Sequence, residues 1–475
     1  MKKAMIWIMV FIISSSLLII SAGGCKKAAE EVKETAAEEV KETAAEEVKE
    51  TAAEEVKETA AEEVVSLKFW HHEAPAHRVA AFEQVIDLFE KEFPNIKVEQ
   101  EVVMWGDAWP KTIAAIEAGD GPDFQFSIPD LLLTSFLLDA VIPVTDLVEE
   151  MDQKYKFFEG QKQIYFHDNE YWGIPIWTMV MMLTYVPSLL EKYVGTTEPP
   201  KDWEEYLEYA ELCTDPDNGV YGVALGGAIN LMTTEQAYIF MTNTGAKFFD
   251  EEGNVIFNNP KTVQAIKMYA DLFKYNPPGA ESWSWGEVEL NTMAQKIAMS
   301  SYFPAVQRRF HMELDSDDYS GAHHPYPSDG QPGTLTYPNE IHIYKWTKDK
   351  PGHLEATYEF IRFLLRPEIN YIITAVQEQG GFYPPTEATM QAPEFWNDPI
   401  ISRFKEMNEF ALESLEYATL YGFEYGKWVN LGIGDITGAN VLAEVINRAV
   451  TGAMTVEQAV EWGHNEMEKY SVPVK

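Results

Sequence analysis

The sequence predicts an α/β protein with a largely parallel sheet, and three observations lead to this prediction. From residue 66 onward, short apolar runs typical of strands alternate with amphipathic helical stretches in the order β-α-β-α-β. The chain has 475 residues, which is too long for one ordinary core and suggests two domains. Aromatic residues make up 13% of it, and so many rings need cores or a lined cleft to cover them.

The first elements of residues 66–475, which we call the body, follow simple periodicity. Each expected strand is a short apolar run, and the first helix carries apolar side chains at helical spacing. Pro94 stops this helix, Pro110 stands in the first turn of the next, and Gly119 ends that one. In order, we expect a strand over 66–70, a helix over 78–93, a strand over 96–103, a helix over 110–118, a strand over 123–127 and a helix from about 129.

Turn and cap signals define the later elements. Residues 167–170 predict a hairpin turn, and residues 252–254 predict another. Asp202 opens a helix as an acidic variant of a capping box, and Thr455 opens the last helix with Gln458 as its partner. We expect hairpin strands over 162–166 and 171–176, a helix from 202 to about 212, a hairpin over 247–257, a helix over 260–275, strands over 297–301 and 336–344, a helix over 351–365 and an almost wholly helical part from about 395.

The first 25 residues are typical of a secretory signal. Lys2 and Lys3 precede an apolar stretch over 4–20, and the small residues 21–24 lead to Cys25. This ending resembles the lipobox of bacterial lipoproteins, with Ala22 where Leu is usual. The resemblance implies that Cys25 is lipidated and anchors an exported protein to the bacterial cell membrane, facing the periplasm or the exterior. A short transmembrane anchor and an ordinary cleaved signal are the alternatives.

Residues 26–65 are an internal repeat with a period of eight, built on the unit Lys-Glu-Thr-Ala-Ala-Glu-Glu-Val. The composition favours helix, but the Val positions drift by about 80° with each unit, so they form no lasting apolar stripe. We therefore expect a semi-rigid, partly helical tether that holds the body off a membrane. A slipped repeat in the DNA, without a specific role, is the alternative.

Charge and cysteine content exclude several classes of function. The formal net charge is -40, which leaves no basic face for nucleic acid and discourages anionic ligands, although a local pocket can override the global field. The two cysteines are Cys25 and Cys213. We expect no intrachain disulfide, because Cys25 carries the lipid. The adjacent His71 and His72 point apart on an extended chain, so a metal site is not expected there.

Nine short motifs occur along the body, and each alone is weak. They are LKFWH at 67–71, FEKEFPNIKV at 89–98, GDGPDF at 119–124, YWGIP at 171–175, PPKDWEE at 199–205, FFD at 248–250 before Gly253, AQKIAM at 294–299, FLLRPE at 363–368 and GGFYP at 380–384. Together, and in this order, they resemble extracellular solute-binding protein family 1, the sugar-binding lipoproteins of ABC importers. Two departures are Gln295-Lys296 for the usual Gly-Lys and Asp202 for a Thr or Ser cap.

The resemblance implies the two-lobe, type II-like periplasmic-binding-protein fold, with a hinge and a ligand cleft between the lobes. It implies one lobe from about 66–176 and 325–380, and a second from about 177–324 and much of the C-terminal helices. It also implies a protein that is not an enzyme and needs no cofactor or metal. Such a protein captures a mono- or oligosaccharide and delivers it to the permease subunits of an ABC transporter. We expect a monomer.

The candidate ligand contacts are aromatic rings, which stack on sugar faces, and polar side chains on loops at strand ends. They are His71, His72, Glu73, Trp105, Asp107, Ser127, Asp130, Trp177, Thr178, Asn230, Trp283, Trp285, Tyr302, Phe382, Tyr383 and Trp428. Each has a structural alternative: Asp107 and Asp130 can serve helix starts, and Trp177 and Trp428 can be core. Asp123 and Trp203 are expected to be structural.

Other functions stay open. A surface-anchored glycoside hydrolase needs two carboxylates across the scissile bond, which so acidic a chain could supply, but the chain has no Gly-x-Ser-x-Gly, His-Glu-x-x-His, phosphate-loop or cofactor motif. A receptor for a chemosensory partner would use the same fold. Polyols and glycerol phosphodiesters are alternative ligands, although the candidate loops hold no cluster of Arg and Lys to favour phosphate.

Overall fold

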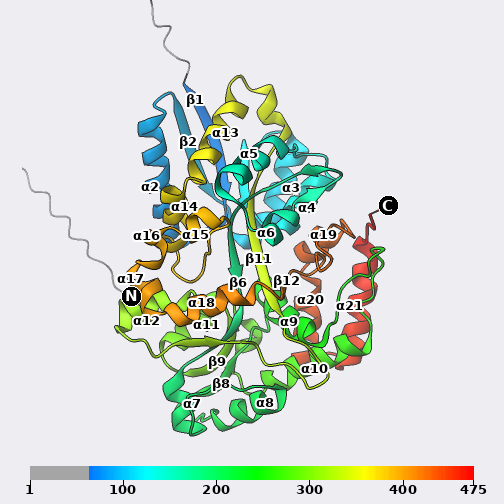
Figure 1. Ribbon diagram of the computed structural model, residues 1–475. Helices are drawn as coiled ribbons and strands as arrows, with labels where there is room; N and C mark the ends of the chain where they lie inside the picture. Colours follow the sequence, from blue (N-terminus) through cyan, green and yellow to red (C-terminus); the bar gives the residue numbers. More distant parts are fainter. Residues whose placement is uncertain (1–63, 475) are drawn as a thin grey trace, which may run out of the picture. The chain divides into compact units, whose positions relative to one another are not determined.

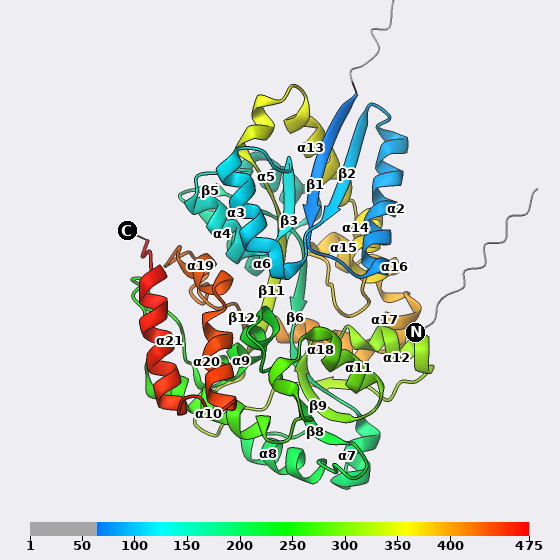
Figure 2. The same ribbon diagram turned by 180° about the vertical axis from the view of Figure 1, so that it is seen from behind.

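The computed structural model describes residues 64–474. The expected signal, Cys25 and all but the last two residues of the repeat lie outside this range. Within the unit Glu63–Lys475, two sheets are covered by helices (Figures 1 and 2). This unit holds two large clusters of buried hydrophobic residues, so it has the cores that it needs to fold on its own.

The first sheet begins with the predicted β-α-β-α-β unit. Strand β1 (Val65–His71) pairs in parallel with β2 (Ile96–Val102) and with β3 (Phe124–Ser127). Helix α2 (Ala76–Glu92) connects the first two strands, and α3 (Ala108–Ala118) precedes the third. The parallel order is therefore confirmed. The helix expected from residue 110 begins two residues earlier, which leaves Pro110 within its first turn.

Antiparallel strands complete this sheet. Strand β11 (Thr334–Ile343) pairs antiparallel with β3 and with β6 (Ile174–Val180), and β12 (Ala418–Thr419) pairs in parallel with β11. The order is β12-β11-β3-β1-β2, with β6 also on β11. The sheet is therefore mixed, so the expectation of a largely parallel sheet is wrong once β6 and β11 are included.

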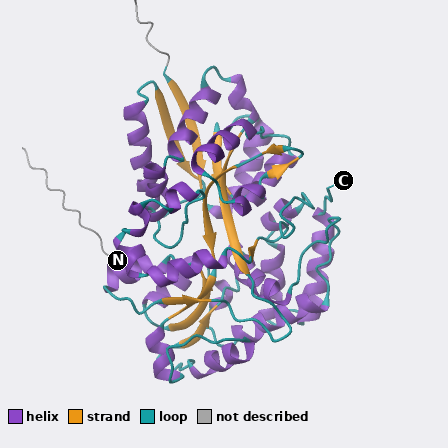
Figure 3. Ribbon diagram, in the orientation of Figure 1, coloured by secondary structure: helices purple, strands orange, loops and turns teal. Residues whose placement is uncertain are grey.

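The second sheet has the order β10-β7-β9-β8. Its strands are β7 (Met182–Tyr185), β8 (Tyr221–Ala224), β9 (Ile297–Tyr302) and β10 (Ser320–Ala322). Because β6 of the first sheet ends at Val180 and β7 begins at Met182, the chain passes almost directly from one sheet to the other. Figure 3 shows β6 and β11 reaching from the first sheet toward the second.

Helices surround both sheets. Beside the second sheet lie α7 (Pro187–Tyr193), α8 (Trp203–Leu212), α9 (Leu231–Thr244), α10 (Pro260–Phe273), α11 (Trp285–Met293) and α12 (Val306–Leu314). The others are α4 (Pro129–Leu137), α5 (Thr145–Tyr155), α6 (Glu159–Gln163), α13 (His353–Leu364), α14 (Pro367–Tyr371), the π-helical turn η4 (Ile372–Val376), α15 (Glu387–Met390), α16 (Pro393–Trp396), α17 (Pro399–Arg403), α18 (Lys405–Ser414), α19 (Ile433–Gly438), α20 (Val441–Val450) and α21 (Val456–Tyr470). Three 3-10 turns are η1 (Trp105–Asp107), η2 (Ala280–Ser282) and η3 (Lys345–Asp349).

The predicted caps are present. The side chain of Asp202 accepts a hydrogen bond of 2.9 Å from the backbone N–H of Glu205, and Thr455 forms a capping box with Gln458. Each satisfies a backbone N–H that the first helical turn leaves unpaired.

Three expected elements differ. The first hairpin is only β4 (Phe166–His167) with β5 (Glu170–Tyr171), because the end of helix α6 and the turn after it occupy all but the last residue of the stretch expected as its first strand. The expected hairpin over 247–257 is one isolated bridge, Phe249 to Val255. The part from 395 is interrupted over 415–432 by loops and β12, whose pairing with β11 could not be read from local periodicity.

The core is rich in aromatic rings. Phe69 of β1 stacks on Phe124 of β3 with 4.9 Å between ring centroids, and Phe360 of α13 packs against both. Trp203 is buried and donates its indole N–H to the carbonyl of Pro325, so its predicted structural role is confirmed. Asp123 is buried as well and accepts from the backbone of Lys68. Among the described helices, none has the length and apolar character needed to cross a membrane.

Candidate functional site

A cavity of about 440 Å³ lies where segments that follow the strands of the first sheet face elements of the second. The residues after β1, the residues around Trp105 after β2 and the segment at Gly381 and Phe382 form one side. The start of α9, the start of α11 and the end of β9 form the other. Ligand sites of α/β folds commonly lie at the carboxyl ends of strands. Backbone and side chains from distant parts of the sequence thus share one concave site.

Six of the predicted contact residues line this cavity. They are His72, Glu73, Trp105, Trp285, Tyr302 and Phe382. Contact between these side chains and a ligand stays a prediction.

Other predicted contacts are occupied by neighbouring protein groups instead of lining the cavity. His71 bonds Gln100 through Nε2, the hydroxyl of Ser127 lies 3.3 Å from Nε2 of His72, and the hydroxyl of Thr178 bonds that of Thr336. Asp107 is exposed and its side chain makes no cap bond, so the alternative role as a cap is wrong for it.

The aromatic residues outside the lining pack as core. Trp177 is fully buried and stacks on Phe382 with 4.5 Å between centroids. Trp428 donates its indole N–H to Ile164 and stacks on His167. The hydroxyl of Tyr383 donates to Asn408. In each case the ring or its polar atom already has a partner, as the structural alternatives anticipated for Trp177 and Trp428.

Two predicted residues, Asn230 and Trp283, are joined by a hydrogen bond. Asn230 caps α9 by accepting from the N–H of Thr233, and its amide donates to the carbonyl of Trp283. Trp283 is buried, whereas its neighbour Trp285, at the first position of α11, lines the cavity. The two tryptophans of this loop therefore divide into one core ring and one cavity ring.

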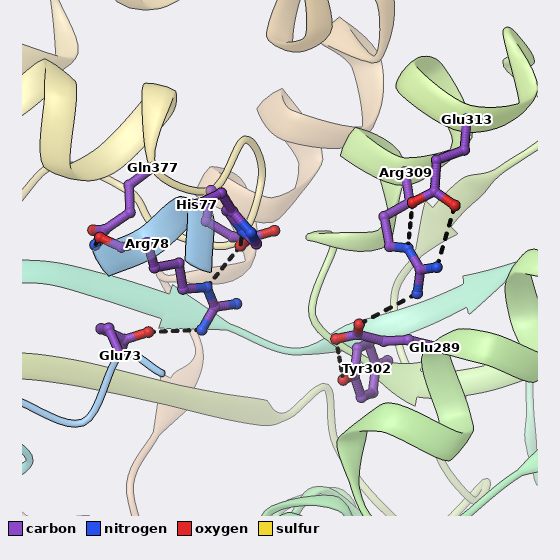
Figure 4. A network of polar contacts seen from close by, with 9 residues as sticks. Glu73, His77, Arg78, Glu289, Tyr302, Arg309, Glu313 and Gln377 are labelled. Atoms are coloured by element: carbon purple, nitrogen blue, oxygen red, sulfur yellow. Dashed lines mark hydrogen bonds and ion pairs between the residues drawn. The ribbon is translucent and has the colours of Figure 1, made fainter. Parts of the chain in front are cut away.

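An ion-pair cluster, which we call the Arg78 cluster, forms one wall (Figure 4). Nη1 of Arg78 lies 2.7 Å from Glu73, and its Nε lies 2.7 Å from Glu378, which also bonds His77. Burial raises the pKa of Glu73, although Arg78 opposes this. Burial acts in the same sense on Glu378, but Arg78 and His77 outweigh it and lower the pKa of that carboxyl. The Arg78 cluster therefore places two carboxyl groups around one guanidinium, which favours the ionised form of Glu378.

A second polar group faces the cavity from α11 and β9 (Figure 4). The hydroxyl of Tyr302 donates a hydrogen bond of 3.0 Å to Glu289, and Nη1 of Arg309 lies 3.7 Å from the same carboxylate. Burial raises the pKa of Glu289, and the Tyr302 hydroxyl and Arg78 oppose that rise. Glu289 therefore lines the cavity with a carboxyl group that already accepts a hydrogen bond from Tyr302.

Aromatic faces are available beside these charges. The ring of Trp105 is partly buried and stacks on His72 with 4.2 Å between centroids. Burial lowers the pKa of His72 to about 3, so this imidazole is neutral at physiological pH. The ring of Phe382 has Trp177 stacked on it and the guanidinium of Arg78 over it at 4.8 Å. Trp105 and Trp285 consequently offer more free ring surface than Phe382.

Asp130 lies in a polar network behind the cavity. It accepts hydrogen bonds from Thr437 and Tyr337, and the Tyr337 hydroxyl also bonds Tyr421. Burial raises the pKa of Asp130 to about 6. Since Tyr337 lines the cavity and Asp130 does not, Asp130 bonds the lining rather than forming it.

Sequence reasoning missed Arg78, Glu235 and Glu289, all of which line the cavity. Arg78 stands in the first turn of the helix that follows the candidate loop at 71–73, and this position was a usable signal. Glu235 and Glu289 look like ordinary polar positions of helices. No trio of His, Cys, Asp or Glu among residues 64–474 is arranged to hold a metal ion.

Comparison with known proteins decides the family. A model of the family "Bacterial extracellular solute-binding protein" matches residues 75–371, more than half of the chain. The chain belongs to this family. The nine motifs therefore led to the correct family, whose description as extracellular agrees with predicted export.

Relatives of this solute-binding protein span most of its length. YcjN of Escherichia coli K12, which has the provisional name ABC transporter periplasmic-binding protein, is 23% identical over 418 residues and covers 85% of this chain and 92% of its own. The maltotriose-binding protein of Pyrococcus abyssi is 22% identical, with 72% of this chain and 71% of its own covered. A tagatose-bound ABC transporter solute-binding protein of Thermotoga lettingae has a TM-score of 0.72 at 22% identity, covering 86% and 99%. The predicted fold class is confirmed.

Proposed function

We propose that this protein is the substrate-binding component of an ABC importer and that it captures a mono- or oligosaccharide in the cavity. The observation that carries the proposal is the lining itself. Trp105, which follows β2, and Trp285, which begins α11, bring two indole rings to one cavity that also holds carboxylates and a guanidinium. Rings that stack on sugar faces and a few placed polar groups are what a carbohydrate site needs. Relatives named for maltotriose and tagatose support the same ligand class.

In this proposal the protein performs no chemistry. The ligand favours a closed arrangement of the two lobes, and the closed form presents it to the permease subunits. The proposed lobes are those expected from the family: about 66–176 with 325–380, and about 177–324 with much of the C-terminal helices. The protein acts as a monomer.

A thermal-shift screen of residues 64–475 against sugars, polyols and glycerol phosphates tests the proposal. A ligand at 100 times its dissociation constant adds about 2.7 kcal/mol to the free energy of unfolding, which raises the melting temperature visibly. We expect a sugar to produce the shift and to be recovered intact by chromatography. Consumption of the sugar would show a glycoside hydrolase instead. A thermal shift only with polyols or glycerol phosphates would show that the ligand belongs to one of those classes and is not a sugar.

We further propose that Cys25 is lipidated and that the repeat over 26–65 tethers the body to the membrane. The small residues before Cys25 support this, as does a family of extracellular proteins. Expression of the full chain with labelled palmitate tests it. Label in the membrane fraction that is lost in Cys25→Ser supports the anchor, and equal release of both proteins into the medium contradicts it.

A further inference from the structure

Glu235 is the unusual residue of the cavity. It lies in the second turn of α9, lines the cavity and is only 4% exposed. Its Oε2 is buried and has no hydrogen-bond partner among the described residues. A buried polar atom without a partner costs free energy, and such atoms are rare in folded proteins. This carboxylate therefore requires an explanation.

Several of the protein's own donors at the cavity bond other groups. The hydroxyl of Tyr337 donates to Asp130, and that of Tyr302 donates to Glu289. The amide of Asn339 donates to the backbone carbonyl of Tyr337. Arg78 already bonds both Glu73 and Glu378. None of these groups hydrogen-bonds Glu235.

Glu235 is also the cavity carboxylate that lacks a compensating group. Glu73 is paired with Arg78, and Glu289 has Tyr302 and, at 3.7 Å, Arg309. Burial raises the pKa of Glu235 well above its ordinary value, and the nearby Asp130 raises it further. Both effects disfavour the ionised form in the ligand-free protein. A hydroxyl or ammonium group brought by a ligand would stabilise the ionised form by donating a hydrogen bond to it, whereas an anionic group would disfavour that form further.

We propose that Glu235 determines the specificity of this cavity: its carboxylate accepts a hydrogen bond from a hydroxyl or ammonium group of the carbohydrate, and it excludes carbohydrates that carry a carboxylate or phosphate at that position. The inference rests on the proposed function, because it names which carbohydrates the same cavity takes. Hydrogen bonds to an ionised acceptor are the stronger class, so a single such bond can set a preference.

The substitution Glu235→Gln tests this, with Glu424→Gln as the matched control. Glu424 also contacts α9, where its carboxylate accepts from Tyr238, but it does not line the cavity. The unaltered protein and both variants are titrated calorimetrically with sets that differ in one group: glucose, glucosamine and glucuronic acid, the corresponding galactose set, and the sugar that gives the largest thermal shift.

We expect neutral or amino sugars to bind and the acidic member of the same set to bind at least about 100-fold more weakly. Glu235→Gln should lower the affinity for the best ligand by about 10- to 100-fold. It should also reduce the ratio between the affinities for the neutral and the acidic sugar to less than about 10-fold. The affinities of Glu424→Gln should stay within about 2-fold of those of the unaltered protein. A larger loss for the amino sugar than for the neutral sugar identifies an ammonium donor, and equal losses identify a hydroxyl.

The melting temperature of ligand-free Glu235→Gln separates a binding role from a structural one. Because the change removes an unpaired buried carboxylate, it should leave this temperature unchanged or raise it. Unaltered affinity in Glu235→Gln, or tight binding of an acidic sugar, overturns the inference while a positive sugar screen leaves the proposed function standing. Binding of no carbohydrate at all overturns both.

Discussion

Arg78 and Glu378 are 300 positions apart in the sequence, and yet Nε of Arg78 donates a hydrogen bond of 2.7 Å to Oε2 of Glu378. Arg78 belongs to the first turn of α2, and Glu378 follows η4. Through its Nη1, Arg78 also holds Glu73 in the loop after β1. One guanidinium thereby ties two distant segments into a single wall of the cavity.

Removing the charge of Glu378 should loosen this wall. Glu378→Gln removes one of the two carboxyl groups that pair with Arg78 in a buried setting. We therefore expect a loss of about 1–3 kcal/mol in the free energy of unfolding, measured by urea titration. Glu313→Gln is the control, because Glu313 pairs with Arg309 at the surface and should cost less than about 1 kcal/mol. Equal losses in the two variants would contradict the role of the Arg78 cluster.

Asp130 should impose a pH dependence on stability. Its pKa is raised from 3.8 to about 6 in the folded protein, chiefly by burial. A carboxyl whose folded pKa is raised contributes stability that is fully present below pH 4 and is lost as the pH rises through 6. The free energy of unfolding, measured relative to Asp130→Asn, should therefore fall by about 3 kcal/mol between pH 4 and pH 7. Parallel pH curves for the two proteins would show that Asp130 is not buried as described.

Gly380 should tolerate no side chain. Its φ is +78°, and an added Cβ would overlap the side-chain amide of Gln307, which is buried and held by two hydrogen bonds with Asn408. Gly380→Ala therefore combines backbone strain with a clash, and we expect a loss of more than about 2 kcal/mol in thermal unfolding. Gly426→Ala isolates the strain, because Gly426 has a φ of +64° and open space around it, and should cost about 1 kcal/mol. If Gly380→Ala and Gly426→Ala lose the same amount of stability, Gln307 does not approach Gly380 as closely as described.

Trp105 should contribute to ligand binding, whereas Trp109, four positions later, should contribute to stability. Trp105 lines the cavity, so Trp105→Ala should weaken the best carbohydrate of the screen by about 10-fold or more while changing the melting temperature little. Trp109 donates its indole N–H to the carbonyl of Gly434, so Trp109→Ala should instead lower the melting temperature. Calorimetric titration and thermal unfolding of both variants measure this, and a reversed pattern would remove Trp105 from the proposed site.

Local signals were sufficient for much of the fold. The caps at Asp202 and Thr455 were predicted because a cap depends on residues three positions apart. The turn at Asp168 and Asn169, both with positive φ, was predicted for the same reason. The strand expected over 162–166 was wrong because its apolar run has only three residues, too few to distinguish a helix end from a strand. Helix α6 ends at Gln163, and a turn follows it.

The site was harder to predict. Glu73 and Trp105 were found because they follow strands, and strand ends converge in an α/β fold. Glu235 was not found, because a glutamate in a helix is usually solvated, and only the packing of α9 against the cavity buries it. Trp177 and Trp428 could not be assigned from sequence, since both core and cleft cover large rings.

By itself the sequence determined the alternation of strands and helices, the helix starts and the family, because each depends on neighbouring residues or on the order of short motifs. The tertiary structure alone decided which loops form one cavity, which tryptophans keep a free face and which carboxylates have partners. Those outcomes depend on contacts such as Arg78 with Glu378, whose members are brought together by the packing of α2 against η4. Burial and hydrogen bonding of a side chain are set by the tertiary structure. They make Glu235, which looks ordinary in the sequence, the candidate residue for a hydrogen bond to the ligand.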